Sequence, residues 1–583
     1  MHSTLHRLAA ALVACAAWGS AHAQEDMVLV HDGKSDHVLV LGTEATRSEE
    51  RGARELQAFL ARMSGAEIAL VDDQGPLPER AILVGRSRHT DALGVAVDAS
   101  LGDEGFLLRT AGERLVVAGG RLRGTMYGCY ELLERLGVRF FTPEVTRVPE
   151  LRTVTLPALD ERHVPAFEYR EPFFTEAQER EWAARNRVNG FAANLDSSTG
   201  GKISYHPFVH TFEAIVPPAL FAEHPEYFSL VRGRRFGGYG QRCLTNPEVF
   251  AMAVRRVLDW IAEAPDATIH SVSQNDTGNP CECDACRAKI EEYGAPSGLY
   301  LWFVNRVAEE VEKSHPGKLI DTLAYQFTEA PPRGIVPRKN VRVRLCPISC
   351  CEAHPYESCS DPANAAFLAH LSGWSKVTDT LYIWHYNTDF AHYLMPFPDF
   401  DEFPAEIRLY RRTGVKGIFF EGAYGPGGGG SDAELRSWVM AKLLFNPDLD
   451  AGALVDEWMD GVYGAAARSM RQWFDLLHER VRDPSRHLHI YDSPDAAFLG
   501  DDTLARGDAL FDEAERLAAA DPVATRYVAK ARLSLRYVKL ARSPAAGPEL
   551  DSFLADVRRA GIAQIAEGLS VDAWEARYRE SAK

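Results

Sequence analysis

Residues 268–276 read TIHSVSQND, a short apolar run that ends in polar side chains. Such a run is typical of a buried strand in a parallel sheet, and the polar residues mark its end. Outward from it, further runs of this kind alternate with stretches of helical spacing between residues 165 and 446. This alternation predicts a parallel sheet. The predicted strands are Phe167–Phe173, Gly190–Leu195, Tyr227–Val231, Thr268–Ser273, Leu319–Tyr325, Val341–Cys346, Thr380–Tyr386 and Val415–Glu421.

Eight strand–helix units over roughly 260 residues are the usual size of a (β/α)8 barrel, so we predict a barrel at residues 165–446. The 583-residue chain is too long for one hydrophobic core. Residues 27–160 predict an N-terminal α/β domain, because short apolar runs alternate there with helical spacing. Residues 447–583 are rich in Ala, Leu, Arg and Glu and predict a C-terminal helical region. The predicted fold class is α/β.

The charge of the chain excludes some classes of partner. It carries 64 Lys and Arg residues against 82 Asp and Glu residues, a formal net charge of −18. An acidic surface repels nucleic acid and anionic lipid, so we expect neither as a partner. Beyond the first residues, no segment is apolar over the length that a membrane-spanning helix needs.

The start of the chain has the pattern of an export signal. The apolar run Leu8–Ala17 is too short to span a bilayer and precedes AHA at residues 21–23, a typical A-x-A cleavage site. We therefore predict a signal peptide at residues 1–23 and a protein that is periplasmic or secreted. The alternative is a lipoprotein signal with an acylated Cys15, which we favour less because the apolar run before Cys15 is short.

A barrel of this kind has its active site at the carboxyl ends of its strands. Polar and aromatic side chains stand at the predicted ends of six strands. One such residue alone is more often a satisfied loop group or a core ring, but the repetition favours a binding site. Aromatic rings beside carboxylates and amides suit a carbohydrate substrate, because rings stack on the CH faces of sugars. The predicted substrate-binding residues are Asn194, His210, Tyr325, Gln326, Trp384, His385 and Tyr386.

Cleavage of a glycosidic bond usually needs two carboxyl groups, one to protonate the leaving oxygen and one to attack or to activate water. Asp276 and Glu421, at the ends of the fourth and eighth predicted strands, are the best-placed pair. If the sugar carries a 2-acetamido group, its carbonyl oxygen can be the nucleophile. The protein then needs one polar side chain to orient that amide and one acid. We expect Asn275 to orient the amide and Asp276 to donate the proton.

Three cysteines follow the fourth predicted strand in the pattern C-x-C-x-x-C: Cys281, Cys283 and Cys286. Three thiols at this spacing can hold a structural zinc ion, with Cys346 or Cys350 as the fourth ligand. Disulfides are the alternative in an exported protein, and we favour them slightly over zinc. No other cofactor is expected. A second cysteine cluster, near the sixth predicted strand, comprises Cys346, Cys350, Cys351 and Cys359.

A glycine-rich run, GPGGGG at residues 425–430, follows the eighth predicted strand. It lacks the terminal Lys and the Ser or Thr of a phosphate-binding loop. We therefore expect a flexible loop over the active site.

Two groups of motifs resemble known families. Residues 123–128 (RGTMYG) and 136–141 (LGVRFF) resemble the N-terminal domain that α-glucuronidases and β-hexosaminidases share. The second group resembles a bacterial domain family long labelled as of unknown function, part of which is classed as glycoside hydrolase family 163. That resemblance covers about residues 30 to 480. Its motifs are Ser273–Asp276, the cysteines that follow, residues 323–325 (LAY), Trp384–Tyr386 and Glu421.

The second resemblance implies an endo-β-N-acetylglucosaminidase that acts on N-glycans and retains configuration through the acetamido group of the substrate. It implies a catalytic acid at Asp276 or Glu421. Two other functions remain open from the residues. A hydrolase of another linkage, such as an α-glucuronide, would need a cation for the uronate, which Arg170, Arg242 or Arg344 would supply. A non-catalytic glycan-binding protein on a degenerate barrel is the other, and the two carboxylates argue against it.

Overall fold

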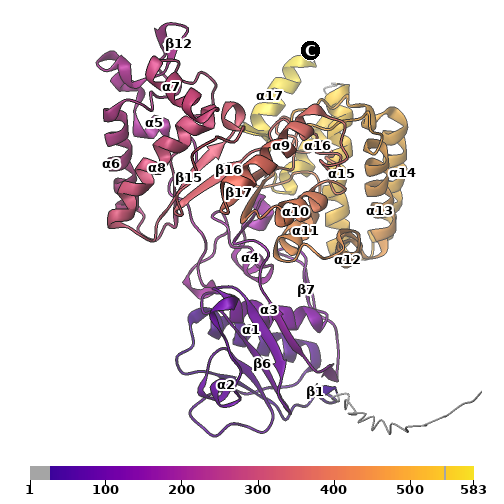
Figure 1. The fold of residues 1–583 in the computed structure, drawn as a ribbon. Helices are drawn as coiled ribbons and strands as arrows, with labels where there is room; N and C mark the ends of the chain where they lie inside the picture. Colours follow the sequence, from indigo (N-terminus) through magenta and orange to yellow (C-terminus); the bar gives the residue numbers. More distant parts are fainter. Residues whose placement is uncertain (1–25, 544–546, 583) are drawn as a thin grey trace, which may run out of the picture.

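The computed structural model of this protein describes residues 26–543 and 547–582. The predicted signal peptide at residues 1–23, with Cys15, lies outside these described residues. The chain forms an N-terminal sheet with two long helices, a central parallel sheet with its own helices, and a C-terminal group of helices (Figure 1). Within the described ranges, no helix combines the length and the apolar character needed to cross a bilayer.

The N-terminal part is built on a mixed sheet. Its strands are β1 (Met27–Val30), β2 (Val38–Leu41), β3 (Leu70–Asp72), β4 (Ala81–Val84), β5 (Phe106–Thr110), β6 (Arg114–Gly119), β7 (Arg139–Phe140), β8 (Thr146–Arg147), β9 (Val154–Leu156) and β10 (Asp160–His163). Six of them form one sheet in the order β10-β5-β6-β4-β2-β3. Its helices are α1 (Arg47–Ser64), α2 (Arg88–Ala92) and α3 (Gly124–Arg135).

Local sequence explains where α1 begins and ends. The Thr46 hydroxyl accepts from the Glu49 amide, and the Glu49 carboxylate accepts from the Thr46 amide. This reciprocal pair satisfies amide groups that have no partner within the helix. Gly65 follows the last turn with φ 78°, a left-handed conformation that glycine adopts without strain and that ends a helix.

The central sheet is parallel throughout and curls into a half barrel. Its strands are β11 (Tyr169–Phe173), β14 (Ile269–Ser271), β15 (Leu319–Ala324), β16 (Val341–Leu345), β17 (Leu381–Tyr386) and β18 (Gly417–Glu421). They lie in the order β11-β18-β17-β16-β15-β14. The helices of this part are α4 (Arg180–Arg185), α5 (Phe212–Ile215), α6 (Pro247–Glu263), α7 (Asp284–Tyr293), α8 (Pro296–Ser314), α9 (Pro362–Val377) and α10 (Phe403–Arg412).

Two of the eight predicted strands are absent from this sheet. Residues 190–195 form a turn flanked by irregular backbone, and Tyr227 lies in a short 3-10 turn. Only β12 (Leu230–Val231) remains of the third predicted strand, and it pairs with β13 (Arg234–Arg235) in a separate hairpin. Gly233, with φ 77°, closes this tight hairpin. The prediction of a closed eight-stranded barrel is therefore corrected to a six-stranded parallel sheet.

The chain is irregular where the second predicted strand was expected because it bends around Glu171. An added Cβ at Gly190 would lie 1.8 Å from the Glu171 carboxylate, and the Ala192 amide donates to that carboxylate instead of to a strand. Farther along, the His206 amide donates to the Ile269 carbonyl of β14 at 2.9 Å. Irregular segments therefore lie along the sheet edges where two strands were predicted.

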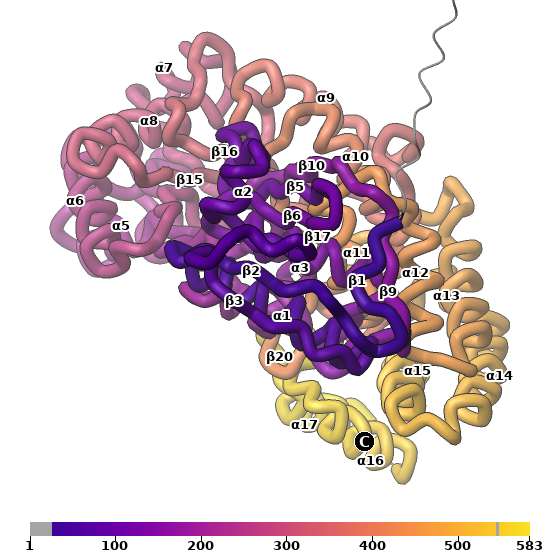
Figure 2. Tube along the Cα trace, turned by 90° about the horizontal axis from the view of Figure 1, so that it is seen from below, coloured from indigo at the N-terminus to yellow at the C-terminus, as the bar shows by residue number. Residues whose placement is uncertain are grey.

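The C-terminal part is helical apart from one small hairpin. Its helices are α11 (Ala433–Phe445), α12 (Ala451–Tyr463), α13 (Ala467–Val481), α14 (Asp501–Ala518), α15 (Pro522–Arg542), α16 (Pro548–Arg559) and α17 (Val571–Ser581). The hairpin pairs β19 (Gln564–Ala566) with β20 (Leu569–Ser570). Seen from the N-terminal side, the C-terminal helices occupy one side of the molecule and α5 to α8 the other (Figure 2).

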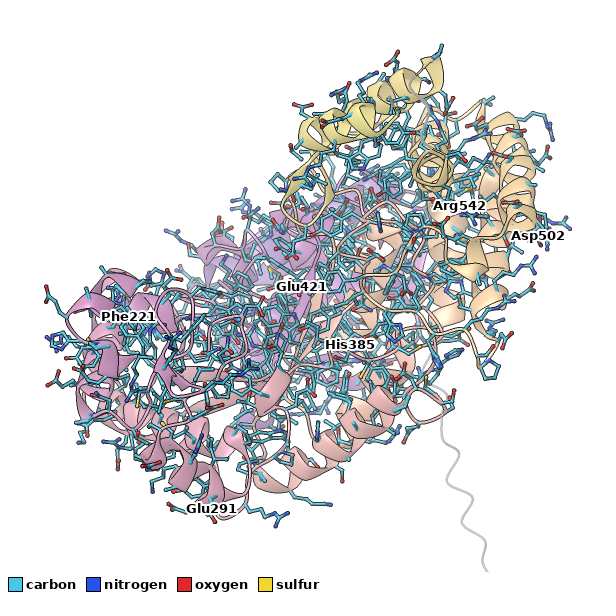
Figure 3. All side chains as sticks on the ribbon, turned by 90° about the horizontal axis from the view of Figure 1, so that it is seen from above. Phe221, Glu291, His385, Glu421, Asp502 and Arg542 are labelled. Atoms are coloured by element: carbon cyan, nitrogen blue, oxygen red, sulfur yellow. The ribbon has the colours of Figure 1, made fainter. Side chains whose placement is uncertain are left out.

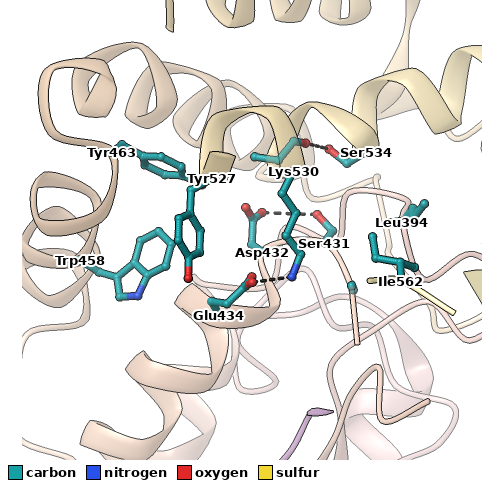
Figure 4. Close-up of a pocket in the computed structure, with 13 residues that line it drawn as sticks. Leu394, Ser431, Asp432, Glu434, Trp458, Tyr463, Tyr527, Lys530, Ser534 and Ile562 are labelled. Carbon is teal, nitrogen blue, oxygen red and sulfur yellow. Dashed lines mark hydrogen bonds and ion pairs between the residues drawn. The ribbon is translucent and has the colours of Figure 1, made fainter. Parts of the chain in front are cut away.

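A half-buried ion pair attaches the C-terminal helices to the central part. Lys530 of α15 contacts the carboxylate of Glu434 at the start of α11 (Figure 4), and its ammonium lies 3.5 Å from Glu176. A small cavity of about 30 Å³ remains beside this pair, lined in part by Trp458 and Tyr527. The contact between the C-terminal helices and the central part therefore includes a charged pair and aromatic side chains.

The glycine-rich run at residues 425–430 is packed rather than free. Gly427, Gly428 and Gly429 all have positive φ angles, from 64° to 97°. An added Cβ at Gly427 would lie 2.1 Å from the Gly561 carbonyl oxygen. The run needs glycine because the C-terminal segment passes directly over it. The expectation of a flexible loop is therefore wrong.

A second buried cluster joins the N-terminal part to the central sheet. The Glu104 carboxylate accepts from the guanidinium of Arg123 at 2.7 Å and from that of Arg170, on β11, at 2.8 Å. Burial by itself would raise the pKa of Glu104, but the two guanidinium groups hold it at about 2. This carboxylate is therefore charged wherever the protein is folded at neutral pH.

We expect Glu104→Gln to lower the free energy of unfolding by about 3–5 kcal/mol, because it leaves two buried guanidinium groups without their counter-charge. The pKa of Glu104 is depressed by folding, so its stabilising contribution is complete above about pH 4.5 and is lost as the pH falls toward 2. Denaturant unfolding at several pH values measures both effects. Glu150→Gln, at an exposed site, is the matched control. Equal stability of the two variants would contradict the assignment.

Candidate active site

The carboxyl ends of the central strands surround a cavity of about 290 Å³. Seen from above, Glu421 lies near the middle of the molecule, between the central sheet and the C-terminal helices (Figure 3). Aromatic side chains form most of the cavity wall. These are Phe173, Phe208, His210, Tyr325, Trp384, Tyr386, Phe390, Tyr424 and Tyr491. The carboxyl groups in the lining are Asp276, Glu421 and Glu567.

Glu421 is the last residue of β18, and its side chain is buried against the aromatic wall. Its Oε2 accepts a hydrogen bond from the indole N–H of Trp384 at 2.8 Å. Burial raises the pKa of Glu421 to about 8; the Trp384 hydrogen bond opposes the rise, and the charges of Glu567 and Asp276 add to it. Glu421 therefore carries a proton at neutral pH and can donate it.

Asp276 lies across the cavity on the loop after β14 and is exposed. Its Oδ1 accepts from the Tyr325 hydroxyl at 3.0 Å and from the Gln326 amide at 3.4 Å. The backbone amide of Asp276 donates to the Tyr239 hydroxyl at 3.2 Å. Burial and the Asp276 charge raise the pKa of Tyr325 above its ordinary value, so its hydroxyl stays a donor. These contacts fix the direction of the carboxylate.

His210 lines the cavity from the loop between β11 and β14. Its ring Nδ1 donates to the Gln274 carbonyl at 2.7 Å, and its amide donates to the Ser273 hydroxyl at 2.9 Å. With Nδ1 engaged, Nε2 is the ring nitrogen left for a ligand. The backbone of His210 has a φ of 54°, which is uncommon for a residue other than glycine.

Asn275 does not reach the cavity, and its predicted role is corrected. The side chain is completely buried. Its Nδ2 donates to the Gly240 carbonyl at 2.9 Å, and its Oδ1 accepts from the Glu213 amide at 3.0 Å. Alternation along the chain explains the difference, because neighbouring side chains in extended backbone point to opposite sides. Asn275 therefore braces two loops while Asp276 faces the cavity.

His385 and Asn194 are also corrected. Along β17, Trp384 and Tyr386 face the cavity, and His385 between them faces the other side of the sheet. The His385 ring is fully buried between Glu352 and Glu402, with its Nε2 3.2 and 3.3 Å from their carboxylates. Asn194 is exposed and does not line the cavity, and its predicted strand does not form. Gln326 reaches the site only through Asp276.

The cavity is completed by residues that the sequence did not predict. Glu567, at the tip of the β19–β20 hairpin, accepts from the Tyr424 hydroxyl at 2.6 Å. Its amide donates to the Phe390 carbonyl at 2.8 Å, which holds the hairpin over the carboxyl end of β17. Tyr491 enters the lining from the segment between α13 and α14. The Glu567-Gly568 turn inside a helical region was the only sequence signal for the hairpin.

The cavity offers no cation for a uronate. In the part of the chain that the structure describes, its lining contains three carboxylic side chains and neither Lys nor Arg. Arg170 pairs with Glu104, and Arg242 donates to the Val216 carbonyl. Arg344 lies beneath the cavity, paired with Asp321. None of the three predicted cations therefore lines the cavity.

The cysteines gather differently from the prediction. The thiols of Cys281, Cys283 and Cys286 meet Cys243, and not Cys346 or Cys350. Farther along the chain, Cys351 and Cys359 meet two histidines. Among the described residues no cysteine forms a disulfide. Three cysteines of the first group follow the Asp276 loop, and both cysteines of the second group lie in the loop after β16.

Comparison with known families agrees with this architecture. The model of a domain family of unknown function, DUF4838, matches residues 140–475, which is more than half of the chain. The model of the glycosyl hydrolase family 67 N-terminus matches residues 28–132. These matches confirm the predicted resemblance to a family of unknown function and the N-terminal likeness to glycoside hydrolases. Among curated proteins, no sequence matches the chain.

A solved structure of a glycoside hydrolase shares the fold. A family GH115 4-O-methyl-α-glucuronidase with specificity for decorated arabinogalactans, BtGH115A, is 14% identical, with 95% of this chain and 79% of that chain covered and a TM-score of 0.58. A GH20 exo-β-N-acetylglucosaminidase from Vibrio harveyi is 11% identical, with 75% of this chain and 74% of that chain covered and a TM-score of 0.41. At 14% identity the likeness to BtGH115A describes the fold and not the reaction.

We expect Arg344→Met to lower the free energy of unfolding by about 3–5 kcal/mol, because it leaves the Asp321 charge buried and unpaired. Asp321→Leu should lower the free energy of unfolding by a similar amount, because it leaves the Arg344 charge buried and unpaired. The double variant should recover most of the loss, because neither charge then remains. Denaturant unfolding of the three variants measures these values as a double-mutant cycle. Additive losses in the double variant would contradict the pairing.

Proposed function

We propose that this chain, which belongs to the DUF4838 family, is a glycoside hydrolase that cleaves a bond to an uncharged sugar in a complex glycan. One observation carries the proposal: Glu421, protonated at neutral pH, and the Asp276 carboxylate line the same aromatic cavity. A proton donor and a carboxylate are the two groups that glycosidic cleavage needs. We propose further that the protein acts outside the cytoplasm, in the periplasm or after secretion.

Glu421 is assigned the role of the acid. Its proton is held in an apolar setting and is available for the leaving oxygen, and the indole N–H of Trp384 stabilises the carboxylate that forms. Asp276 is assigned the role of the carboxylate that acts on the nucleophile. The two side chains that donate to Asp276, those of Tyr325 and Gln326, both contact Oδ1. Oδ2 is therefore the oxygen left to meet the substrate. These roles reverse the expectation that Asp276 donates the proton.

The finer proposal is an endo-β-N-acetylglucosaminidase that acts on N-glycans with assistance from the substrate acetamido group. The resemblance to glycoside hydrolase family 163 supports it. Asp276 Oδ2 would then accept the acetamide N–H and turn its carbonyl oxygen toward the anomeric carbon. An α-glucuronide substrate is less favoured, because a uronate would meet three carboxyl groups without a cation. Turnover by the native protein would exclude a non-catalytic glycan-binding function.

We expect Glu421→Gln and Asp276→Asn each to lower kcat by about 10²- to 10⁴-fold, because each removes a group that acts on the proton or the nucleophile. The assay is release of glycan from a complex N-glycoprotein, with aryl N-acetylglucosaminide and aryl glucuronide in parallel. Glu223→Gln, at an exposed site, is the control. Unchanged turnover by Glu421→Gln would refute the assignment. A GlcNAc-derived thiazoline should inhibit the native protein if the acetamido group assists.

The pH profile should follow the proton on Glu421. Its pKa is raised to about 8, and the protonated form is the active one, so kcat/KM should be retained below pH 8 and fall about tenfold per unit above it. Trp384→Phe removes the hydrogen bond that lowers this pKa, so the alkaline fall should move to higher pH. Trp302→Phe, on α8 away from the cavity, should leave the profile unchanged. A Trp384→Phe profile that moves to lower pH would contradict the mechanism.

A further inference from the structure

Four metal-binding side chains from two distant segments meet beside the cavity. Cys351, His354 and Cys359 lie in the loop after β16, and His487 lies in the segment between α13 and α14. The Nδ1 of His354 is 3.6 Å from the Cys351 sulfur and 3.8 Å from the Cys359 sulfur. The Nδ1 of His487 is 3.7 Å from the Cys359 sulfur. All four ligand atoms lie within 4.8 Å of one another.

This spacing fits a tetrahedral metal and not a disulfide. Zn–S bonds of about 2.3 Å and Zn–N bonds of about 2.0–2.1 Å place neighbouring ligand atoms about 3.5–3.8 Å apart. A disulfide would instead need the two sulfurs about 2.05 Å apart. The Asp361 amide also points at the Cys359 sulfur, at 3.5 Å, as N–H groups do at thiolate ligands. Two thiolates and two neutral imidazoles would balance the charge of a divalent ion.

We propose that Cys351, His354, Cys359 and His487 bind a structural zinc ion that ties the loop after β16 to the segment between α13 and α14. The consequence for the cavity is direct, because Tyr491 lies four residues after His487 and belongs to the lining. The Ile490 carbonyl also accepts from the Phe390 amide at 2.8 Å. The zinc ion thus fixes the segment that brings Tyr491 over the carboxyl end of β17.

Four other residues form a second proposed zinc site. The Cys243 sulfur lies 3.7 Å from that of Cys283 and 3.9 Å from that of Cys286, and Cys281 completes the group. Four sulfurs about 3.8 Å apart are the arrangement of a tetrahedral zinc centre with four thiolate ligands. The Leu230 amide donates to the Cys281 sulfur at 3.4 Å. This ion would anchor the segment that follows Asp276.

Metal analysis of the purified full-length protein tests both sites, which do not depend on the proposed reaction. Inductively coupled plasma mass spectrometry should find two zinc ions per chain. Cys359→Ser should reduce the content to one, and so should Cys283→Ser. The control is Cys350→Ser, a buried cysteine in the same loop as the first site but outside both groups, which should retain two. X-ray absorption of the native protein should show an average of three sulfur ligands and one nitrogen per zinc.

Each result bears on a named site. A folded native chain without zinc, or peptides linked by a Cys351–Cys359 or Cys283–Cys286 disulfide after non-reducing digestion, would overturn the proposal. A zinc content that Cys359→Ser leaves unchanged would overturn the first site, and the same result with Cys283→Ser would overturn the second. If a variant fails to fold, thiol titration of the native protein replaces it, and zinc release in step with the modified thiols is the supporting result. Thiol modification without zinc release would overturn both sites.

Discussion

A buried ion pair between Arg344 and Asp321 is the constraint on which the cavity depends. Both side chains lie in the core beneath the cavity, where neither charge is tolerated without the other. Asp321 also accepts from the Ser271 hydroxyl, which contacts the Ser273 hydroxyl, and Ser273 accepts from the His210 amide. The pair therefore connects three strands with the loop that carries His210. The guanidinium also packs on the rings of Tyr205, Phe208, Trp384 and Phe419.

The two carboxyl groups of the site have different surroundings, and these give them different chemical roles. Glu421 sits at the end of a central strand among aromatic rings, and its burial favours the protonated form. Asp276 sits on a solvent-exposed loop and receives two donors on one oxygen. The same functional group thus serves as the proposed acid at Glu421 and as the proposed carboxylate at Asp276. Among the described residues the lining holds neither Lys nor Arg, which is why the proposed substrate is an uncharged sugar, although the fold resembles that of an α-glucuronidase.

The C-terminal part contributes to the site as well as to stability. The β19–β20 hairpin brings Glu567 to the cavity, and the segment after α13 brings Tyr491. The segment before this hairpin packs on the glycine-rich run at residues 425–430, where any side chain at Gly427 would collide with the backbone at Gly561. The proposed zinc ion at His487 would secure the other segment. The cavity is therefore shared between the central sheet and segments that lie far beyond Glu421 in the chain.

The sequence by itself determined the parallel sheet, the flanking parts and the placement of Asp276, Tyr325, Trp384 and Glu421 at strand ends, because apolar periodicity and strand polarity are local properties. It could not show that Asn275 and His385 turn away from the cavity, since one residue of register decides the face. The sequence also could not show that the second predicted strand does not form, because the bend at Gly190 depends on the Glu171 carboxylate of β11. Only the tertiary structure brought Glu567 to the site and Cys243 to its three partners, since such contacts join residues that are distant in the chain.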